Sequence, residues 1–462
     1  MSLPFLGLVA YLAFVYFEPA IWFPWLAEYR VALIIPLVTL VVAILRGARL
    51  PRAPQHALFI LLLLTAVIST LFSIEVQRSL DHLAMLMKGV AFYFLVVLVV
   101  QSARSLRALL NVILIYGGLT TVATLITSKL DISRPGNSDL YRLSSFFGGI
   151  GDGPNEFGAL LLALLPLPLC LLEADSSVRK KVALTTLALA IMLCITRTRS
   201  RGAFVGVVVV LGLLLLESRW RLRLALLLAP LVALVILYTH SGYWDRIATL
   251  ESAEAIRAEG GAYGRLMQAQ YALQLMALRP FTGVGLGNFV HAKITLLGLD
   301  PQSGLTQHVE HSAYLAIGAE IGALGMLILL AILGVSILQT YRSQRILSSS
   351  PELYVLSRTS KAIRIGLIGF ATAILFLSEQ YNSVLYQWVA FIVILRALAQ
   401  QHERPAPIAG AASPAALPAM PRVAHGAVHL RDAGKPAQRE TLLLRNSRPA
   451  AAQTEPSIGG GP

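Results

Sequence analysis

The sequence predicts an all-α fold, a polytopic transmembrane helical bundle with about 12 spans. Hydrophobic residues make up 56% of the 462 residues and charged residues only 13%, whereas soluble domains average about a quarter charged. Apolar runs such as Ala57–Ile68 and Val205–Leu216 lie within stretches of roughly 20 residues that carry few charges, the length that a bilayer core requires of a helix. The short alternating segments typical of a membrane β-barrel do not occur in the sequence.

The apolar stretches place the spans in order along the chain. We expect them near residues 2–17, 30–46, 56–73, 83–101, 108–127, 155–173, 182–197, 203–217, 222–239, 311–337, 362–380 and 382–398. A large, partly helical extracytoplasmic loop, about 241–310, separates the ninth span from the tenth, and another long loop covers about 128–155. The membrane domain is therefore predicted at 1–398. Residues 399–462 are predicted to form a disordered cytoplasmic tail, because this Pro- and Ala-rich stretch cannot bury enough apolar surface to offset the entropy of ordering.

The basic residues indicate the orientation of the chain. They gather in the connectors after the even-numbered spans, which contain Arg46, Arg49, Arg52, Arg104, Arg107, Arg179, Lys180, Lys181, Arg219, Arg221, Arg223, Arg342 and Arg345. Under the positive-inside rule this pattern predicts that both termini are cytoplasmic. It also accounts for the formal charge of +14 without a nucleic-acid partner. Cys170 and Cys194 lie within apolar spans, which argues against a disulfide framework.

One connector breaks this charge rule. Residues 196–202 read Thr-Arg-Thr-Arg-Ser-Arg-Gly and form a tight turn that the topology places outside, yet they include Arg197, Arg199 and Arg201. The planar guanidinium group suits bidentate binding of phosphate oxygens. Ser200 and the helix that follows add hydroxyl and backbone donors. The turn therefore favours an anion site, and contact with lipid headgroups or a misplaced topology is the alternative.

The long outer loop contains a second polar group. Residues 262–278 have apolar residues at helical spacing, and Pro280 ends the predicted helix. Arg265 lies at the start of this helix, where the dipole disfavours a cation; this indicates an anionic partner, although a solvated loop arginine explains it equally well. Arg279 opens a glycine-rich segment that no strand precedes, which excludes a Rossmann-type nucleotide site.

The third polar group, residues 308–315, begins the tenth predicted span with His-Val-Glu-His-Ser-Ala-Tyr-Leu. His311, followed by Ser312, lies where water meets lipid, and histidine exchanges protons near neutral pH. A catalytic or substrate-orienting role is favoured. The alternatives are an interfacial histidine without such a role and a metal pair with His308, for which no third ligand is evident.

Two further polar residues lie at or within spans. Asn155 follows Gly151-Asp-Gly-Pro, where a turn and a helix start are the simplest interpretation and a place in an outer cavity is the alternative. Lys88 lies within the fourth span, and we expect it to face the bundle interior, where it binds phosphate or pairs with a carboxylate.

Three blocks of the sequence resemble the O-antigen ligase and O-antigen polymerase superfamily of bacterial polytopic glycosyltransferases. They are Asp152–Ala159, Thr198–Ala203, and the Arg-Pro-x-x-Gly-x-Gly-x-Gly-Asn-Phe of 279–289 leading to His311-Ser312. As in the ligase branch, His311-Ser312 is followed by nine residues and then Gly322-Ala-Leu-Gly. The blocks occur in the expected order between the expected spans.

This resemblance implies transfer of an oligo- or polysaccharide from undecaprenyl diphosphate to an acceptor at the periplasmic face of the bacterial inner membrane. The acceptor class is lipid A core, a protein or a growing polymer, and no metal or other cofactor is implied. The resemblance further implies that Arg199, Arg201 and Arg265 bind the diphosphate and that His311 is the candidate base. The accessory candidates are Arg197, Lys88, Arg279, Asn155 and Ser312.

Two other functions stay open. A polymerase that extends lipid-linked repeat units shares much of the pattern and differs in its acceptor. A transporter or flippase would favour ionisable residues near the bilayer midplane and two matching halves. Here the charges concentrate at the predicted outer edge, and no internal repeat is evident in the sequence.

Overall fold

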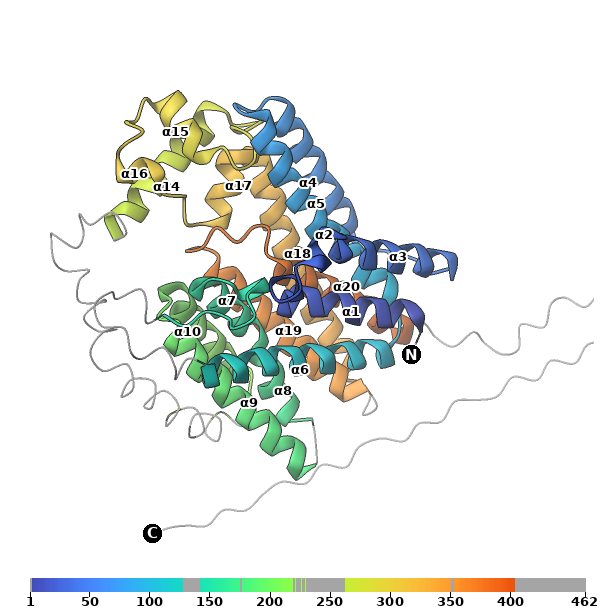
Figure 1. Cartoon of the computed structure of the whole chain (residues 1–462). Coiled ribbons are helices and arrows are strands. Elements are labelled where there is room, and N and C mark those ends of the chain that lie inside the picture. The colour runs from blue at the N-terminus through green and yellow to red at the C-terminus, as the bar shows by residue number, and fades with distance from the viewer. Residues whose placement is uncertain are drawn as a thin grey trace, which may run out of the picture. The chain divides into compact units, whose positions relative to one another are not determined.

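The computed structural model describes residues 2–127, 142–174, 177–218, 262–349 and 353–403, together with 221, 226 and 229. Within these ranges every regular element is a helix (Figure 1), which confirms the all-α prediction. The predicted ninth span at 222–239 and the predicted tail beyond 403 lie outside the described residues. The helices below all belong to one compact unit, Met1–Pro405.

The described helices follow the order of the predicted spans. They are α1 (Leu3–Phe17), α2 (Trp25–Glu28), α3 (Val31–Leu45), α4 (Pro54–Leu71), α5 (Val76–Val99), α6 (Ala103–Thr127), α7 (Pro154–Leu164), α8 (Pro166–Leu172), α9 (Val178–Arg197), α10 (Arg201–Leu216), α14 (Ala262–Leu278), α15 (Phe289–Leu297), α16 (Gly304–Gln307), α17 (Ala313–Ile321), α18 (Ala323–Leu347), α19 (Tyr354–Ala373) and α20 (Ser383–Glu403). Two short 3₁₀ helices, η1 (Pro19–Ile21) and η3 (Gly149–Gly151), complete the described set.

Within the described ranges, six helical segments are long and apolar enough to cross a membrane. They are Pro54–Leu71, Val76–Val99, Ala103–Thr127, Pro154–Leu172, Ala323–Leu347 and Ser383–Glu403. The shorter apolar helices are Leu3–Phe17, Val31–Leu45 and Arg201–Leu216. The chain is thus a multi-pass membrane protein, and the full number of about 12 spans stays a prediction.

Several predicted spans have different limits in the structure: α5 begins at Val76 and not at residue 83, and two later spans differ more. The span expected at 311–337 is wrong as one helix, because α17 ends at Ile321 and α18 begins at Ala323. Between them Gly322 has φ +93°, and the amide of Ala323 donates to the carbonyl of Pro280 at 2.8 Å instead of continuing α17. The span expected at 362–380 is also displaced: α19 ends at Ala373, and residues 374–382 form a non-helical connector to α20.

Helix α20 lies in the interior of the bundle, against α5, α18 and α19. Its residues Trp388 and Phe391 are fully buried. Helix α19 packs on α7, α8 and α10 and buries three cations near its beginning. Arg358 pairs with Glu173 at 2.6 Å, Arg364 pairs with Glu217, and Lys361 donates to the Glu217 carbonyl at 3.1 Å. Partners of this kind are what make a buried charge tolerable.

The four helices α14–α17, called the loop helices below, form a separate group at one end of the bundle beside α4 and α5 (Figure 1). Their own small core contains Leu275, Val284 and Phe289. Asn288 fixes this group to α5, because its side-chain amide donates to the Ser79 hydroxyl at 2.8 Å. The predicted helix at 262–278 is confirmed as α14.

Candidate functional site

The arginine turn, residues 197–202, connects α9 to α10. Arg199 has φ +50°, a left-handed conformation that residues other than glycine seldom adopt. The Thr198 hydroxyl accepts a hydrogen bond from the amide of Ser200 at 3.2 Å, and the Ser200 side chain caps α10 by accepting from the amide of Ala203 at 3.4 Å. The backbone on both sides of Arg199 is therefore fixed, and strain of this kind concentrates at functional sites.

Arg142 holds the arginine turn in place through hydrogen bonds. Its Nε donates to the Thr198 carbonyl at 3.1 Å and its Nη2 donates to Asn155 Oδ1 at 2.5 Å, while the amide of Leu143 donates to the Arg197 carbonyl at 3.1 Å. Asn155, an accessory candidate, thus joins the first turn of α7 to the arginine turn through Arg142. Sequence reasoning missed this role of Arg142, since a backbone carbonyl that lies distant in sequence leaves no pattern.

His311 lies directly before Ser312, the N-cap residue of α17, and has φ +52°. Ser312 is the N-cap residue of α17 and is buried, and its carbonyl accepts from the amide of Ala316 at 2.8 Å. Burial lowers the pKa of His311 to about 4, and the positive charges of Arg265, His308 and Lys293 act in the same direction. The imidazole is therefore neutral at neutral pH and able to accept a proton.

The loop helices bring Arg265 of α14 close enough to His311 for its positive charge to lower the pKa of His311. Lys293 of α15, which sequence reasoning missed, is completely buried. Its Nζ donates to Gln268 Oε1 at 2.6 Å and to the His308 carbonyl at 2.7 Å, and it lies over the Phe289 ring at 4.8 Å from the centroid. Burial lowers the pKa of Lys293 to about 8, an effect that the carboxylate of Glu310 opposes.

One connector joins the arginine turn to the His311 segment. A Cβ at Gly202 would lie 3.2 Å from both the Ala373 carbonyl oxygen and the Phe376 side chain. The amide of Ala313, two residues after His311, donates to the carbonyls of Ile374 at 3.0 Å and Leu377 at 2.7 Å. The arginine turn and the His311 segment therefore both lie against the same short segment, residues 373–377.

The glycine-rich segment has a structural role. A Cβ at Gly283, which has φ +65°, would lie 2.3 Å from the Glu320 carbonyl oxygen. The amides of Val284 and Gly285 donate to the carbonyls of Ala319 and Glu320, each at 3.0 Å. Arg279, an accessory candidate, donates from Nη1 to the Phe72 carbonyl at 3.0 Å. These contacts hold α17 against the glycine-rich segment, and they hold the residue after α14 against the end of α4.

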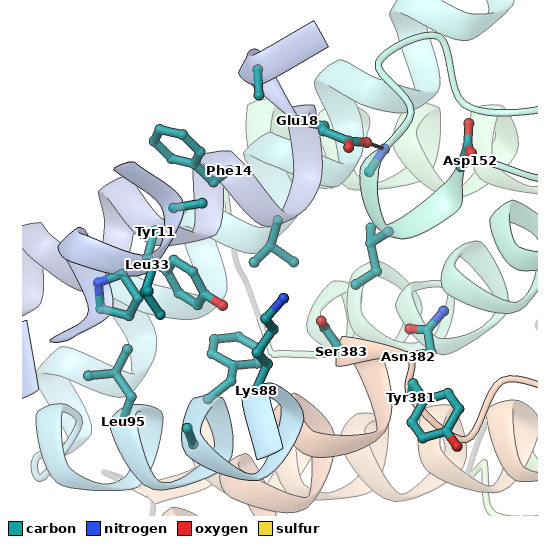
Figure 2. Close-up of a pocket in the computed structure, with 18 of the residues that line it drawn as sticks. Tyr11, Phe14, Glu18, Leu33, Lys88, Leu95, Asp152, Tyr381, Asn382 and Ser383 are labelled. Atoms are coloured by element: carbon teal, nitrogen blue, oxygen red, sulfur yellow. Dashed lines mark hydrogen bonds between the residues drawn. The ribbon is translucent and has the colours of Figure 1, made fainter. Parts of the chain in front are cut away.

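Lys88 does not pack inside the bundle as expected: its side chain is exposed and lines a cavity of about 1050 Å³. Figure 2 shows its amine between apolar side chains such as Leu33 and Leu95 and the polar residues Asn382 and Ser383. The cavity is bounded by α1, α3, α5, the beginning of α7 and the connector 374–382. No residue of the arginine turn lines it.

The histidine pair lacks a third metal ligand in the described part of the chain. The rings of His308 and His311 are 6.4 Å apart between centroids. Within the described ranges no group of three or more His, Cys, Asp or Glu side chains is placed to hold a metal ion. Cys170 and Cys194 are buried free thiols.

Part of the chain matches a known family. No curated protein matches the chain. Residues 184–330 match the family model described as O-antigen ligase. The matched range extends from within α9 to the beginning of α18, so it includes the arginine turn, Arg265, Arg279, His311 and Ser312, and it excludes Lys88 and Asn155. Over residues 184–330, this membrane protein contains the O-antigen ligase family domain.

Proposed function

We propose that the chain transfers a glycan from undecaprenyl diphosphate to an acceptor hydroxyl, as an O-antigen ligase does. The observation that carries the proposal is that the O-antigen ligase match contains both the arginine turn and His311, which one connector joins. In this proposal the site lies at the periplasmic face of the bacterial inner membrane, with both termini cytoplasmic. The positive-inside pattern of the connectors supports that orientation.

Each residue has a chemical role in the proposed reaction. The acceptor oxygen attacks the anomeric carbon of the donor, the carbon–oxygen bond to the diphosphate breaks, and its electron pair leaves with undecaprenyl diphosphate. Arg199, Arg201 and Arg265 stabilise the charge that develops on the diphosphate, with Arg197 nearby. His311 takes the proton of the attacking hydroxyl. No step uses a metal ion.

The low pKa of His311 fits this role once the donor is bound. Without substrate, burial and the cations Arg265, His308 and Lys293 disfavour the imidazolium form. A bound diphosphate adds negative charge beside the same cations and so offsets their effect. Donor binding therefore raises the proton affinity of His311 at the step where a base is needed.

The test uses purified full-length protein in lipid nanodiscs with undecaprenyl-diphosphate-linked glycan, candidate acceptors and a chelator. Wild type is compared with His311→Ala, and products are separated by gel mobility. Glycan appearing on lipid A core and lost in His311→Ala supports a ligase. Lipid-linked chains that lengthen without added acceptor identify a polymerase instead. Binding of the donor without any transfer contradicts the proposal and favours transport.

A further inference from the structure

The cavity beside Lys88 has two chemically different ends. Leu33 and Leu37 of α3 line one end and are 53% and 57% exposed, so protein does not cover this wall. The other end is lined by Glu18, Asp152, Glu156, Glu379, Asn382 and Ser383. An apolar wall that the protein leaves exposed and a polar end rich in hydrogen-bonding groups fit an amphiphile (Figure 2).

The polar end contains two neighbouring carboxyl groups, Glu156 and Glu379. Burial raises the pKa of Glu379 to about 8, and the nearby Glu156 acts in the same direction, so Glu379 is protonated near neutral pH. Asn382 Nδ2 also donates to Glu379 Oε2 at 2.7 Å. The Glu156 carboxylate folds back over Gly153, where an added Cβ would lie 1.9 Å from its oxygen. The pair thus offers both acceptors and a donor, the combination that recognises hydroxyl groups of a sugar.

The charge of the lining disfavours an anionic headgroup. Glu18, Asp152 and the Glu156–Glu379 pair outnumber the cations Lys88 and Arg30. A diphosphate at this end would approach carboxylates, whereas an uncharged sugar would hydrogen-bond with them. The cavity therefore suits a different substrate from the one that arginine side chains bind.

Two segments place this cavity next to the arginine turn. In α7, Asn155 is linked through Arg142 to the Thr198 carbonyl, and the next residue, Glu156, lines the cavity. In the connector, Phe376 packs near Gly202 and Glu379 lines the cavity three residues later. Each segment thus contacts the arginine turn on one side and the cavity on the other.

We infer that this cavity is the acceptor site: it binds an uncharged sugar attached to a lipid chain, with the chain along α3 and the sugar hydroxyls on Glu156, Glu379 and Asn382. The acceptor role rests on the proposed function, but binding of the amphiphile can be tested without any transfer. Lys88 lies between the two ends and becomes a contact of this amphiphile.

The binding test uses full-length protein in nanodiscs and a photoreactive dodecyl glucoside, with photoreactive dodecyl phosphate as the anionic counterpart. Cross-linked peptides are identified by mass spectrometry. We expect the glucoside to label residues 11–40 and 378–383 and the phosphate to label them less. Leu37→Trp, which fills the apolar end, and Glu379→Gln, which removes a carboxyl, should each reduce labelling about tenfold. The matched controls Leu327→Trp, on the exposed face of α18, and Glu75→Gln, an exposed carboxylate, should not.

Equal labelling in Leu37→Trp and Leu327→Trp overturns the inference, as does stronger labelling by the phosphate. The transfer assay separates it from the proposed function. If wild type transfers glycan and Leu37→Trp does so with an unchanged acceptor KM, the acceptor site is wrong and the proposed function stands. If wild type transfers nothing while the glucoside still labels the cavity, the proposed function fails and the binding site stands. In the expected result, Leu37→Trp raises the acceptor KM and leaves donor affinity unchanged.

Discussion

The surroundings of His311 and of Glu379 differ in charge, although the connector 374–382 contacts the His311 segment and itself contains Glu379. The cations Arg265, His308 and Lys293 add to the effect of burial in lowering the pKa of His311. Around Glu379, burial raises the pKa to about 8, and the nearby Glu156 acts in the same direction. One region therefore favours the uncharged base and the other favours the uncharged acid.

The difference indicates how two substrates are kept apart. A cationic region attracts a diphosphate, and a region of carboxyl groups repels it while accepting hydrogen bonds from hydroxyls. A transferase must bind a charged donor and a hydroxyl acceptor next to each other without exchanging their places. In the proposed reaction, the cations near His311 would favour the charged donor, and the carboxyl groups near Glu379 would favour the hydroxyl acceptor.

The largest expected effect comes from removing charge at the arginine turn. Arg199→Ala and Arg201→Ala should each lower transfer about 100-fold or more, because each removes a cation from the developing charge of the diphosphate. Arg→Lys should restore only part of the rate, since a point charge replaces a bidentate fork. Transfer rates and donor affinity are measured in nanodiscs. Arg179→Ala, an exposed arginine in the first turn of α9, serves as the control. Full activity in Arg201→Ala would remove that residue from the proposed site.

The second effect separates position from charge in the His311 region. Gly283→Ala forces a Cβ to within 2.3 Å of the Glu320 carbonyl and should displace α17 with His311. Gly298 has nearly the same φ, +66°, but nothing lies within 4 Å of its added Cβ. Gly298→Ala should therefore cost only the left-handed penalty of about 1 kcal/mol. The unfolding temperature and the transfer rate should both fall more for Gly283→Ala than for Gly298→Ala. Equal losses in the two variants would contradict a close contact between Gly283 and the Glu320 carbonyl.

The parts of the site that follow from local pattern were predictable from the sequence. The arginine turn departs from the predicted positive-inside pattern, and His311 begins the tenth predicted span, so both could be named as candidates from the sequence. The limits of α17 and α19 could not, because Gly322 and residues 374–382 lie within or beside apolar sequence and their conformation depends on tertiary contacts with Pro280 and Ala313. Glu379 was not identified as a candidate for the same reason, because the predicted span 362–380 included it.

The sequence does not predict the positions of Lys293, Asn155 and Lys88, because each depends on tertiary contacts. Lys293 reads as a solvated loop lysine, and only the packing of α14 and α15 buries it. Asn155 reads as a helix cap, whereas its partner is Arg142. Lys88 reads as a charge inside the bundle, and only the arrangement of α1, α3 and α5 leaves it at a cavity.

A smaller effect should appear in the pH dependence of transfer. Arg265→Gln removes a positive charge that disfavours imidazolium, so the pKa of His311 should rise from about 4 toward its ordinary value of 6.5. The acidic limb of the kcat/KM profile should then move to higher pH, in addition to any loss of donor affinity. Arg279→Gln, whose side chain donates to Phe72, should leave the limb in place. An unchanged limb in Arg265→Gln would show that His311 does not titrate beside Arg265.

The smallest effect concerns the proton on Glu379. Because burial and Glu156 raise the pKa of Glu379 to about 8, Glu379 should be protonated near neutral pH. Infrared titration should show a protonated carboxyl component that Glu379→Gln removes and Glu75→Gln keeps. Glu156→Gln removes a negative charge that raises the pKa of Glu379, so the protonated component should titrate at lower pH. The other polar residues nearby, Asn382, Lys88 and Asp152, stay unchanged in this variant.

The same proton fixes the sign of a stability effect. A carboxyl whose pKa is raised on folding stabilises the protein below the unfolded pKa of about 4.5 and loses that contribution as pH rises toward 8. Wild type should therefore lose more thermal stability than Glu379→Gln between mildly acidic and alkaline pH. Parallel curves for the two proteins would contradict a proton held at Glu379, and with it the donor that a sugar hydroxyl would meet in the cavity. The His311 region provides the opposite case, because its lowered pKa makes stability fall as pH drops below 6.5 toward 4.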